Sequence, residues 1–205
     1  MRLSTTREVI NKFLPYVEGR VLDLGAGSAK YKEMILQKAS EYCSCDAAKN
    51  INIDDVCDVL NLQYPPESFE TVISTQVIEH VNNPYKMAEQ IFKVLKPGGK
   101  VIVTAPFLIP MHSDPDDYFR FTPSGLSEIF KQSGFVIIES GHYGGFFMVL
   151  SETIHFSWFN PYKYKSSRLM TLIEKTAKFF DKIFNSKNIY ANSFVIAQKP
   201  LNTKY

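Results

Sequence analysis

The chain has 205 residues, of which 45% are hydrophobic and 21% are charged, and its formal net charge is +2. This length suits one domain with its own core, and the composition is that of a globular protein rather than a disordered one. A net charge this small does not indicate binding to nucleic acid or to an anionic membrane. We therefore expect a single domain over residues 1–205 and no nucleic-acid partner.

Two further features bound the class of protein. No run of about 18 apolar residues occurs, and residues 1–10 do not resemble a signal peptide, so we expect a cytoplasmic protein. The three cysteines, an odd number without a Cys-x-x-Cys pair, are Cys43, Cys45 and Cys57. They are typical of buried strand residues in a reducing compartment rather than of a disulfide framework. The sequence indicates no metal site.

Helices and strands alternate along the chain. A lead-in helix is predicted at 5–17, where Thr5 and Glu8 have capping-box spacing and an apolar periodicity follows. A glycine turn at 25–28 joins a first buried strand to a helix that continues through about Ala39. Strands are expected at 20–24, 41–45, 56–60, 69–74, 100–105, 135–140 and 193–198. Later helices are expected to begin at Asn83-Pro84 and Thr122-Pro123.

This alternation predicts an α/β fold, a parallel sheet with helices on both faces. Residues 144–190 break the rhythm and form a helical insertion between the last two strands. Its second half is amphipathic, and one face carries Leu169, Leu172, Ile173, Thr176, Ala177, Phe180, Ile183 and Phe184. Packing on the same domain, as a lid, is the commonest use of such a helix. A homodimer interface and peripheral contact with a membrane are the alternatives.

The glycine turn is the most informative stretch. A strand that ends in Gly25 and Gly27 lets a ligand approach the backbone closely, next to amide donors at a helix start. Asp46 follows about 20 residues later and can accept hydrogen bonds from ribose hydroxyls. A nicotinamide-binding Gly-x-Gly-x-x-Gly would need a third glycine where Lys30 stands. A cofactor without phosphates is therefore favoured over a nicotinamide dinucleotide.

Several motifs together resemble one family. VLDLGAGSAKY (21–31), Asp46, CDVLNLQYPPESFETVISTQVIEHV (57–81) and LKPGGKVIVTAPF (95–107) resemble the class I S-adenosylmethionine-dependent methyltransferases, especially the small type 11 branch. The resemblance implies a Rossmann-like sheet, mostly parallel and seven-stranded, with an antiparallel last strand. It also implies S-adenosyl-L-methionine as cofactor and S-adenosyl-L-homocysteine as product. One departure is Glu70, where the family commonly has aspartate.

The resemblance also assigns the cofactor site residue by residue. The implied cofactor-binding residues are Asp23, Gly25, Ala26, Gly27, Asp46, Asp58, Val59, Gln76 and Val77. In this assignment the glycine turn passes beneath the methionine moiety, and Asp46 holds the ribose diol. Asp23 organises the turn or, through water, the amino group of the methionine moiety. Asp58 faces the adenine amino group, although Asp54 or Asp55 could take that role. His80 is expected close to the pocket.

The loop at 106–121 is expected to supply the acceptor side, because ligands of open α/β sheets bind beyond the carboxyl ends of the strands. HSDPDDYFRFTPSGL (112–126) resembles a motif of type 11 enzymes, several of them in glycan or natural-product biosynthesis. His112 is the candidate general base, since an ordinary histidine pKa of about 6.5 suits proton transfer near neutral pH. Tyr118 and Arg120 are candidates to orient the acceptor. The alternative is that these polar side chains only lock the loop.

The sequence therefore predicts a transferase that carries out methylation of a hydroxyl or amine of a small molecule. A sugar nucleotide or glycan intermediate is the first acceptor expected. The alternative is a non-catalytic S-adenosylmethionine-binding or scaffold protein of the same fold. Nucleic-acid methylation is disfavoured, because Ser74-Thr-Gln76 stands where amino-methylating enzymes of nucleic acids often carry an Asn/Asp-Pro-Pro-Tyr/Phe segment.

Overall fold

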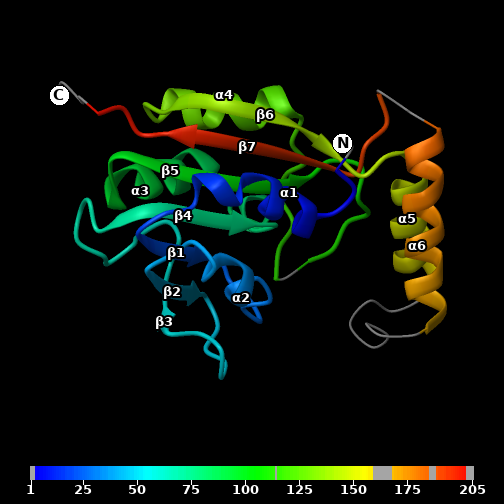
Figure 1. Ribbon diagram of the computed structural model, residues 1–205, viewed down its shortest axis with the longest axis horizontal. Helices are drawn as coiled ribbons and strands as arrows, with labels where there is room; N and C mark the ends of the chain where they lie inside the picture. The colour runs from blue at the N-terminus through cyan, green and yellow to red at the C-terminus, as the bar shows by residue number, and fades with distance from the viewer. Residues whose placement is uncertain (1–2, 114, 159–167, 185–187, 202–205) are drawn as a thin grey trace.

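The computed structural model describes residues 3–113, 115–158, 168–184 and 188–201. Within these ranges seven strands form one sheet in the order β3-β2-β1-β4-β5-β7-β6 (Figure 1). The strands are β1 Arg20–Leu24, β2 Glu41–Asp46, β3 Asp55–Val56, β4 Phe69–Thr75, β5 Leu95–Pro106, β6 Val136–Tyr143 and β7 Asn192–Gln198. Among the described strands β7 alone runs opposite to the others, so the predicted Rossmann-like sheet with an antiparallel last strand is confirmed.

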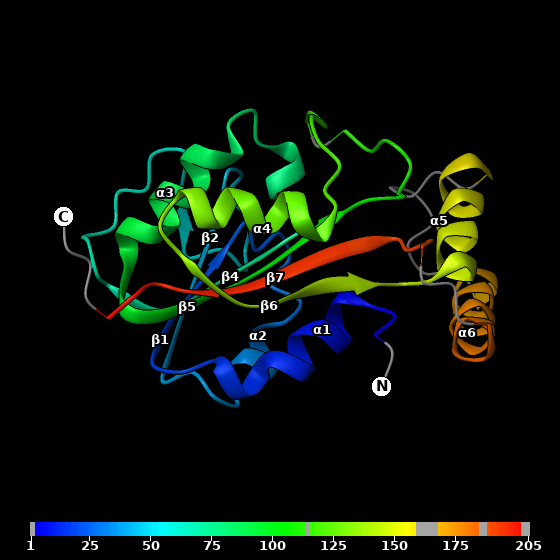
Figure 2. The same cartoon turned by 90° about the horizontal axis from the view of Figure 1, so that it is seen from above.

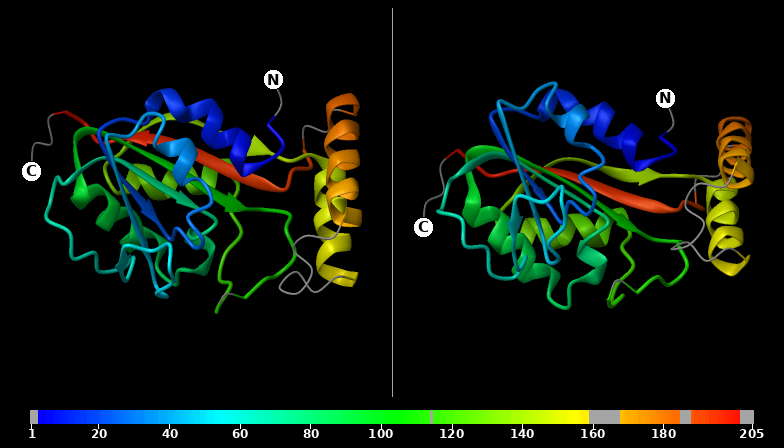
Figure 3. Two further views of the ribbon diagram at one scale, coloured as in Figure 1. Left: turned by 60° about the horizontal axis from the view of Figure 1, so that its bottom comes forward. Right: turned by 90° about the horizontal axis from the view of Figure 1, so that it is seen from below.

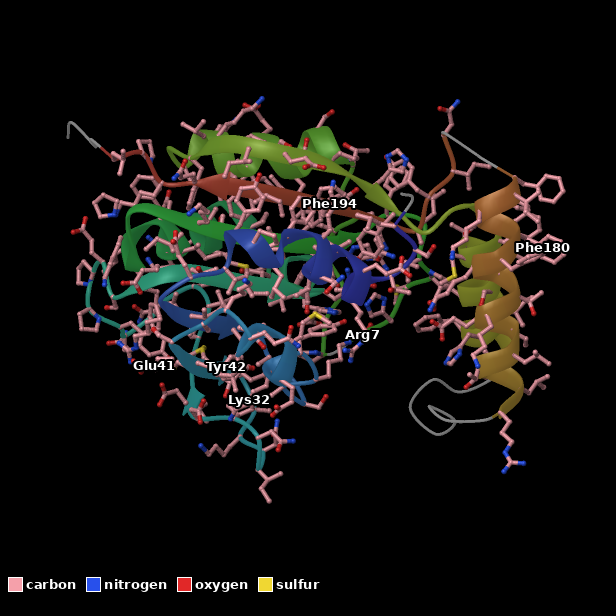
Figure 4. All side chains as sticks on the ribbon, viewed as in Figure 1. Arg7, Lys32, Glu41, Tyr42, Phe180 and Phe194 are labelled. Atoms are coloured by element: carbon pink, nitrogen blue, oxygen red, sulfur yellow. A yellow bond between two sulfur atoms is a disulfide. The ribbon has the colours of Figure 1, made fainter. Side chains whose placement is uncertain are left out.

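Helices cover both faces of the sheet, as predicted. They are α1 Thr6–Phe13, η1 Leu14–Tyr16, α2 Lys32–Ile35, η2 Ile78–His80, α3 Pro84–Val94, α4 Pro123–Gln132, α5 Phe146–Trp158 and α6 Arg168–Ile183. Figure 2 shows α1 and α2 on one side of the sheet and α3 and α4 on the other. A hydrophobic core packs between α1 and the sheet, and in it the rings of Phe13 and Phe194 lie 5.2 Å apart. Phe194 is labelled in Figure 4. Burial of these apolar side chains on both faces stabilises the three layers.

The helix starts follow the capping residues of the sequence. The Thr5 hydroxyl accepts a hydrogen bond from the Glu8 amide at 3.3 Å, which caps α1. The Asn83 side chain accepts from the Lys86 amide at 3.0 Å, and the Thr122 hydroxyl accepts from the Gly125 amide at 3.1 Å. A proline follows each of these last two caps, so the missing proline N–H falls where a helix leaves amides unpaired.

Two predicted elements are much shorter than expected. The helix expected after the glycine turn is reduced to the four residues of α2, because Ala29 has a φ of +52° and interrupts a right-handed helix before Tyr31. The strand expected at 56–60 is only the two-residue β3. Both differences lie beside the glycine turn, so turns and loops rather than a long helix border that part of the sheet.

The cysteines correct a second expectation. Cys45 on β2 and Cys57 just after β3 form a disulfide with Cα atoms 5.8 Å apart, whereas no disulfide was expected. Cys43 is a buried free cysteine on β2, as expected of a strand residue. A spacing of 12 residues along the chain did not reveal that the parallel pairing of β2 with β3 brings Cys45 and Cys57 together. The disulfide joins the segment that carries Asp46 to the one that carries Asp58.

The described residues of the insertion form two helices that pack side by side at one end of the sheet (Figures 1 and 3). They emerge where β6 ends and β7 begins, and the Ala191 amide donates to the Gly144 carbonyl at 2.7 Å across the base. Buried Asp181 of α6 accepts from three backbone amides at the start of α5, those of Gly145, Phe147 and Met148, at 2.8 to 3.1 Å. This carboxylate therefore fixes α5 on α6.

The apolar face predicted for α6 is only partly buried within the chain. Ala177 is buried, but Leu169, Leu172 and Ile183 are exposed, because α6 turns Ala177 and Asp181 toward α5 and leaves its apolar edge outside. Phe180, labelled in Figure 4, packs on Phe147 with ring centroids 5.2 Å apart. In the part of the chain that the structure describes, none of the helices combines the length and the apolar character needed to span a bilayer.

Candidate functional site

The glycine turn leaves β1 and crosses the end of β2. The amides of Gly25 and Ala26 both donate to the Cys45 carbonyl, at 2.8 and 3.1 Å. Gly25 and Gly27 have φ values of +73° and +57°, which favour glycine. A Cβ at Gly25 would lie 2.3 Å from a methyl group of Val77, whereas a Cβ at Gly27 would have no neighbour within 4 Å. The first glycine is thus needed for packing, and the second borders open space.

That open space is a pocket of about 810 Å³ at the carboxyl ends of the parallel strands. Of the nine predicted cofactor-binding residues, eight line it: Gly25, Ala26, Gly27, Asp46, Asp58, Val59, Gln76 and Val77. Other lining residues include Lys30, Thr75, His80, Pro115 and Tyr118. The structure therefore brings segments from β1, β2, β4 and two loops around one cavity. Their individual roles toward a ligand stay predictions.

Two carboxylates face this pocket. Asp46 accepts from the Gly27 amide at 2.8 Å, and Asp58 accepts from the Leu60 amide at 2.8 Å. The two other aspartates considered for the adenine end do not line the pocket: Asp54 is bonded to Ser44, and Asp55 accepts from the Tyr64 hydroxyl. Of these three acids only Asp58 lines the pocket, and its role toward adenine stays a prediction.

Asp23 is the one predicted cofactor residue that lies outside the pocket lining. It is buried beneath the turn, where it accepts a hydrogen bond of 2.6 Å from the hydroxyl of Tyr42, which extends from β2 (Figure 4). Burial raises the pKa of Asp23 from its ordinary value of 3.8 to about 6, and the Tyr42 hydrogen bond partly opposes this. Its position supports the predicted role of organising the turn.

The raised pKa of Asp23 predicts a dependence of stability on pH. The folded chain holds this proton more tightly than the unfolded chain, so stability falls as pH rises from about 4 to about 6. Between pH 4.5 and 7.5 this group alone should lower the free energy of unfolding by about 2 kcal/mol. Asp23→Asn cannot titrate. Urea unfolding of both proteins across this range should therefore show a difference that changes with pH, and parallel profiles would contradict the assignment.

The loop after β5 is held together by Arg120. Its guanidinium pairs with both carboxylate oxygens of Asp117, and its remaining N–H groups donate to the carbonyls of Ile109, Pro110 and Phe119. All five donors of the guanidinium are thus used within the loop. Arg120 does not line the pocket, so the geometry favours the alternative in which it locks the loop rather than orients the acceptor. The same pair lowers the pKa of Asp117 to about 2.

Of the other two acceptor candidates, only Tyr118 lines the pocket. Its side chain is 48% exposed, and its hydroxyl donates to Asp116 at 3.1 Å. His112 instead lies behind His80, with the two rings edge to face and their centroids 5.1 Å apart. It also contacts Phe156 of α5, at 5.7 Å between ring centroids, so the insertion reaches the loop. A direct role of His112 as general base stays a prediction, and His80 is the histidine on the pocket wall.

Glu79 was missed in the sequence. It follows the buried Ile78 on η2, its side chain is fully buried, and no hydrogen-bond partner for either carboxylate oxygen is found among the described residues. Burial raises its pKa from 4.5 to about 8. The available signal in the sequence was a Glu-His pair enclosed by the apolar residues Val77, Ile78 and Val81. An acidic residue in an apolar segment is rarely buried unless it has a partner or a function.

Comparison with known proteins decides the family. The sequence model of a methyltransferase domain family matches residues 2–140. The chain belongs to this family. Its fold and motifs are those of the class I S-adenosylmethionine-dependent methyltransferases, as the sequence resemblance implied.

The curated relatives of this chain include proteins named as N-methyltransferases and others named as O-methyltransferases. Phosphoethanolamine N-methyltransferase 1 of Arabidopsis thaliana is 28% identical over 160 residues, which are 69% of this chain and 30% of that protein. The ubiquinone biosynthesis O-methyltransferase of Xylella fastidiosa is 25% identical over 114 residues, 47% of this chain and 46% of that protein. The chain thus spans less than half the length of these relatives.

Solved structures share the fold of the methyltransferase. A Haemonchus contortus phosphoethanolamine N-methyltransferase 2, in complex with phosphomonomethylethanolamine and S-adenosylhomocysteine, has a TM-score of 0.63 and 19% identity, covering 97% of this chain and 54% of that one. A SAM-dependent methyltransferase of Archaeoglobus fulgidus has a TM-score of 0.64 and 16% identity, covering 94% and 92%. The [4+2]-cyclase SpnF has a TM-score of 0.64 and 17% identity, covering 96% and 80%.

The residues of the pocket fit the cofactor of this family. S-adenosylmethionine carries a sulfonium, an ammonium and a carboxylate group, a net positive charge, and no phosphate. Among the described residues, the acids Asp46 and Asp58 and the base Lys30 line the pocket. Such a lining favours a cationic ligand and disfavours a pyrophosphate. The open space beside Gly27 leaves room for a ligand against the backbone. The cofactor, when bound, supplies an electrophilic methyl group to an acceptor.

Proposed function

We propose that this methyltransferase transfers a methyl group to a hydroxyl or amine of a small molecule, and that a sugar or glycan intermediate is the first acceptor class to test. The observation that carries the proposal is the continuity of the pocket. One cavity runs from the glycine turn and Asp46 to His80, Pro115 and Tyr118. An acceptor held against these last residues would face the cofactor end of the same cavity.

Positioning is the main contribution expected of the protein. A bound near-attack geometry can supply several kcal/mol of the acceleration for an in-line displacement. The Tyr118 hydroxyl can hydrogen-bond a polar acceptor, and the His80 ring is close enough to the wall to contact one. The insertion contacts the loop through Phe156 and His112, which supports its proposed use as a cover on the acceptor side. The names of the relatives support amines and hydroxyls alike as acceptors.

An acceptor panel tests the proposal. The purified chain is incubated with S-adenosylmethionine and one compound each from the sugar nucleotides, the aromatic hydroxyls and the phosphorylated amino alcohols, and release of S-adenosylhomocysteine is measured. We expect turnover with one class, and loss of that turnover in Asp46→Ala. Cofactor binding without turnover in any class would instead favour the non-catalytic alternative.

A further inference from the structure

Three side chains, those of Glu79, His80 and His112, meet beside the pocket wall, and the carboxyl oxygens of Glu79 have no hydrogen-bond partner among the described residues. The Oε1 atom of Glu79 lies 3.7 Å from Nε2 of His80 and 3.9 Å from Nε2 of His112. One ligand atom from each residue lies within 4.8 Å of the others. Glu79 is fully buried, and neither of its carboxylate oxygens has a hydrogen-bond partner among these residues. A buried carboxylate left in this state is costly unless a cation or donor compensates it.

The two histidines present lone pairs rather than protons to this point. Nδ1 of His80 contacts the Asp116 carbonyl, and Nδ1 of His112 lies 3.1 Å from the Pro110 carbonyl. A carbonyl oxygen only accepts, so each Nδ1 carries the proton and donates it. In a neutral ring each Nε2 then directs its lone pair toward Glu79. The Nε2–Oε1 distances are too long for hydrogen bonds, so the three ligand atoms converge without a hydrogen bond between them.

We propose that Glu79, His80 and His112 bind a divalent transition-metal ion. Two imidazole nitrogens with one carboxylate suit Mn²⁺, Fe²⁺ or Zn²⁺ better than Mg²⁺ or Ca²⁺, which prefer oxygen ligands. Bonds of about 2.1 Å would place neighbouring ligand atoms roughly 3 to 3.5 Å apart. The two distances from Glu79, 3.7 and 3.9 Å, then close by a few tenths of an ångström, and the two histidine nitrogens, within 4.8 Å of each other, close by at most about 1.3 Å to reach about 3.5 Å. Backbone carbonyls on both Nδ1 atoms are the partners that metal-binding histidines usually have. The proposal departs from the sequence expectation of no metal.

Rigid elements hold this cluster. Glu79 and His80 follow β4 on η2, and His112 belongs to the loop after β5. The amides of Tyr118 and Phe119 donate to the Glu79 carbonyl at 2.8 and 3.3 Å, which fixes the loop to the residue that carries the carboxylate. The cluster is therefore positioned before any ion arrives.

The location suggests what the ion would do. His80 belongs to both the cluster and the pocket wall, so the ion would lie at the acceptor end of the cavity. Three protein ligands leave coordination positions open, and an acceptor hydroxyl that occupied one would lose its proton more readily. This consequence rests on the proposed methyl transfer, whereas metal binding itself does not.

Calorimetric titration of the chelator-treated full chain with MnCl₂, and separately with ZnCl₂, tests the site. We expect one ion per chain and at least about tenfold weaker binding in Glu79→Gln and in His112→Ala. His155→Ala, which removes a histidine outside the cluster, should bind as the wild type does. Absence of binding by both ions, or equal binding in the wild type and the two cluster variants, would overturn the proposal.

Two further measurements on the same samples show whether a loss of metal binding reflects the ion site itself or a failure to fold. Glu79→Gln preserves the shape of the side chain, and its melting temperature without metal shows whether it folds. Added Mn²⁺ should raise the melting temperature of the wild type and leave that of Glu79→Gln unchanged. Binding of S-adenosylmethionine is measured in parallel, because neither Glu79 nor His112 lines the pocket. Loss of metal with the cofactor still bound would separate failure of the ion site from failure of the cofactor site.

Discussion

Replacement of Asp46 by alanine should weaken binding of S-adenosylmethionine by at least about 100-fold. The side chain faces the pocket at the end of β2, and two charge-assisted hydrogen bonds to a ribose diol would supply about 3 kcal/mol or more. The change also removes the acceptor for the Gly27 amide, 2.8 Å from Asp46, which helps to hold the turn. Calorimetry with the cofactor and with S-adenosylhomocysteine measures the loss.

Asp54→Ala is the matched control for this change. Its carboxylate lies in the same segment of the chain but is bonded to the amide and hydroxyl of Ser44, and it does not line the pocket. We expect lower stability with nearly unchanged cofactor affinity. Equal cofactor affinities of the wild type and Asp46→Ala would show that Asp46 does not bind the cofactor.

Gly25→Ala is the second large expected effect. The new Cβ would lie 2.3 and 2.9 Å from the two methyl groups of Val77, and the φ of +73° is itself unfavourable for alanine. Left-handed backbone costs roughly 1–2 kcal/mol and overpacking adds about 1–3 kcal/mol. We expect a loss of about 2–5 kcal/mol in the free energy of unfolding, measured by urea denaturation, together with loss of cofactor binding.

Two further variants distinguish the cost of the left-handed backbone from the cost of the contact with Val77. Gly27→Ala has a similar φ of +57° but no neighbour within 4 Å of the new Cβ, so it should lose only the backbone contribution. Gly25→Ala combined with Val77→Ala removes both methyl groups, and the two changes should couple favourably by at least about 1 kcal/mol. Additive effects, or equal losses at both glycines, would show that contact with Val77 does not decide the requirement for glycine.

The sheet could be predicted because its determinants are local and periodic. Apolar runs such as 20–24 and 69–74, with helix caps at Asn83 and Thr122, specify strands and helix starts that the structure reproduces. The motif order then carried the family resemblance. Eight of the nine cofactor residues could be placed for the same reason: they stand at the carboxyl ends of those strands, which meet at one edge of the sheet.

The remaining features depend on contacts that no local pattern encodes. The left-handed Ala29 shortens α2, and the disulfide between Cys45 and Cys57 follows from parallel pairing of distant segments. The exposed edge of α6 arises because Asp181 bonds the start of α5 and sets the rotation of the helix. The juxtaposition of Glu79 with His112 needs the loop to fold back over η2, and their separation in the sequence gives no indication of it.

Calorimetry of the wild-type chain with S-adenosylmethionine, S-adenosylhomocysteine and NAD⁺ tests the central claim most directly. The acidic pocket lining and Lys30 in place of a third glycine predict micromolar binding of both adenosyl compounds and no binding of the dinucleotide. Binding of NAD⁺, or no binding of either adenosyl compound, would contradict the assignment of this pocket to the methyl donor.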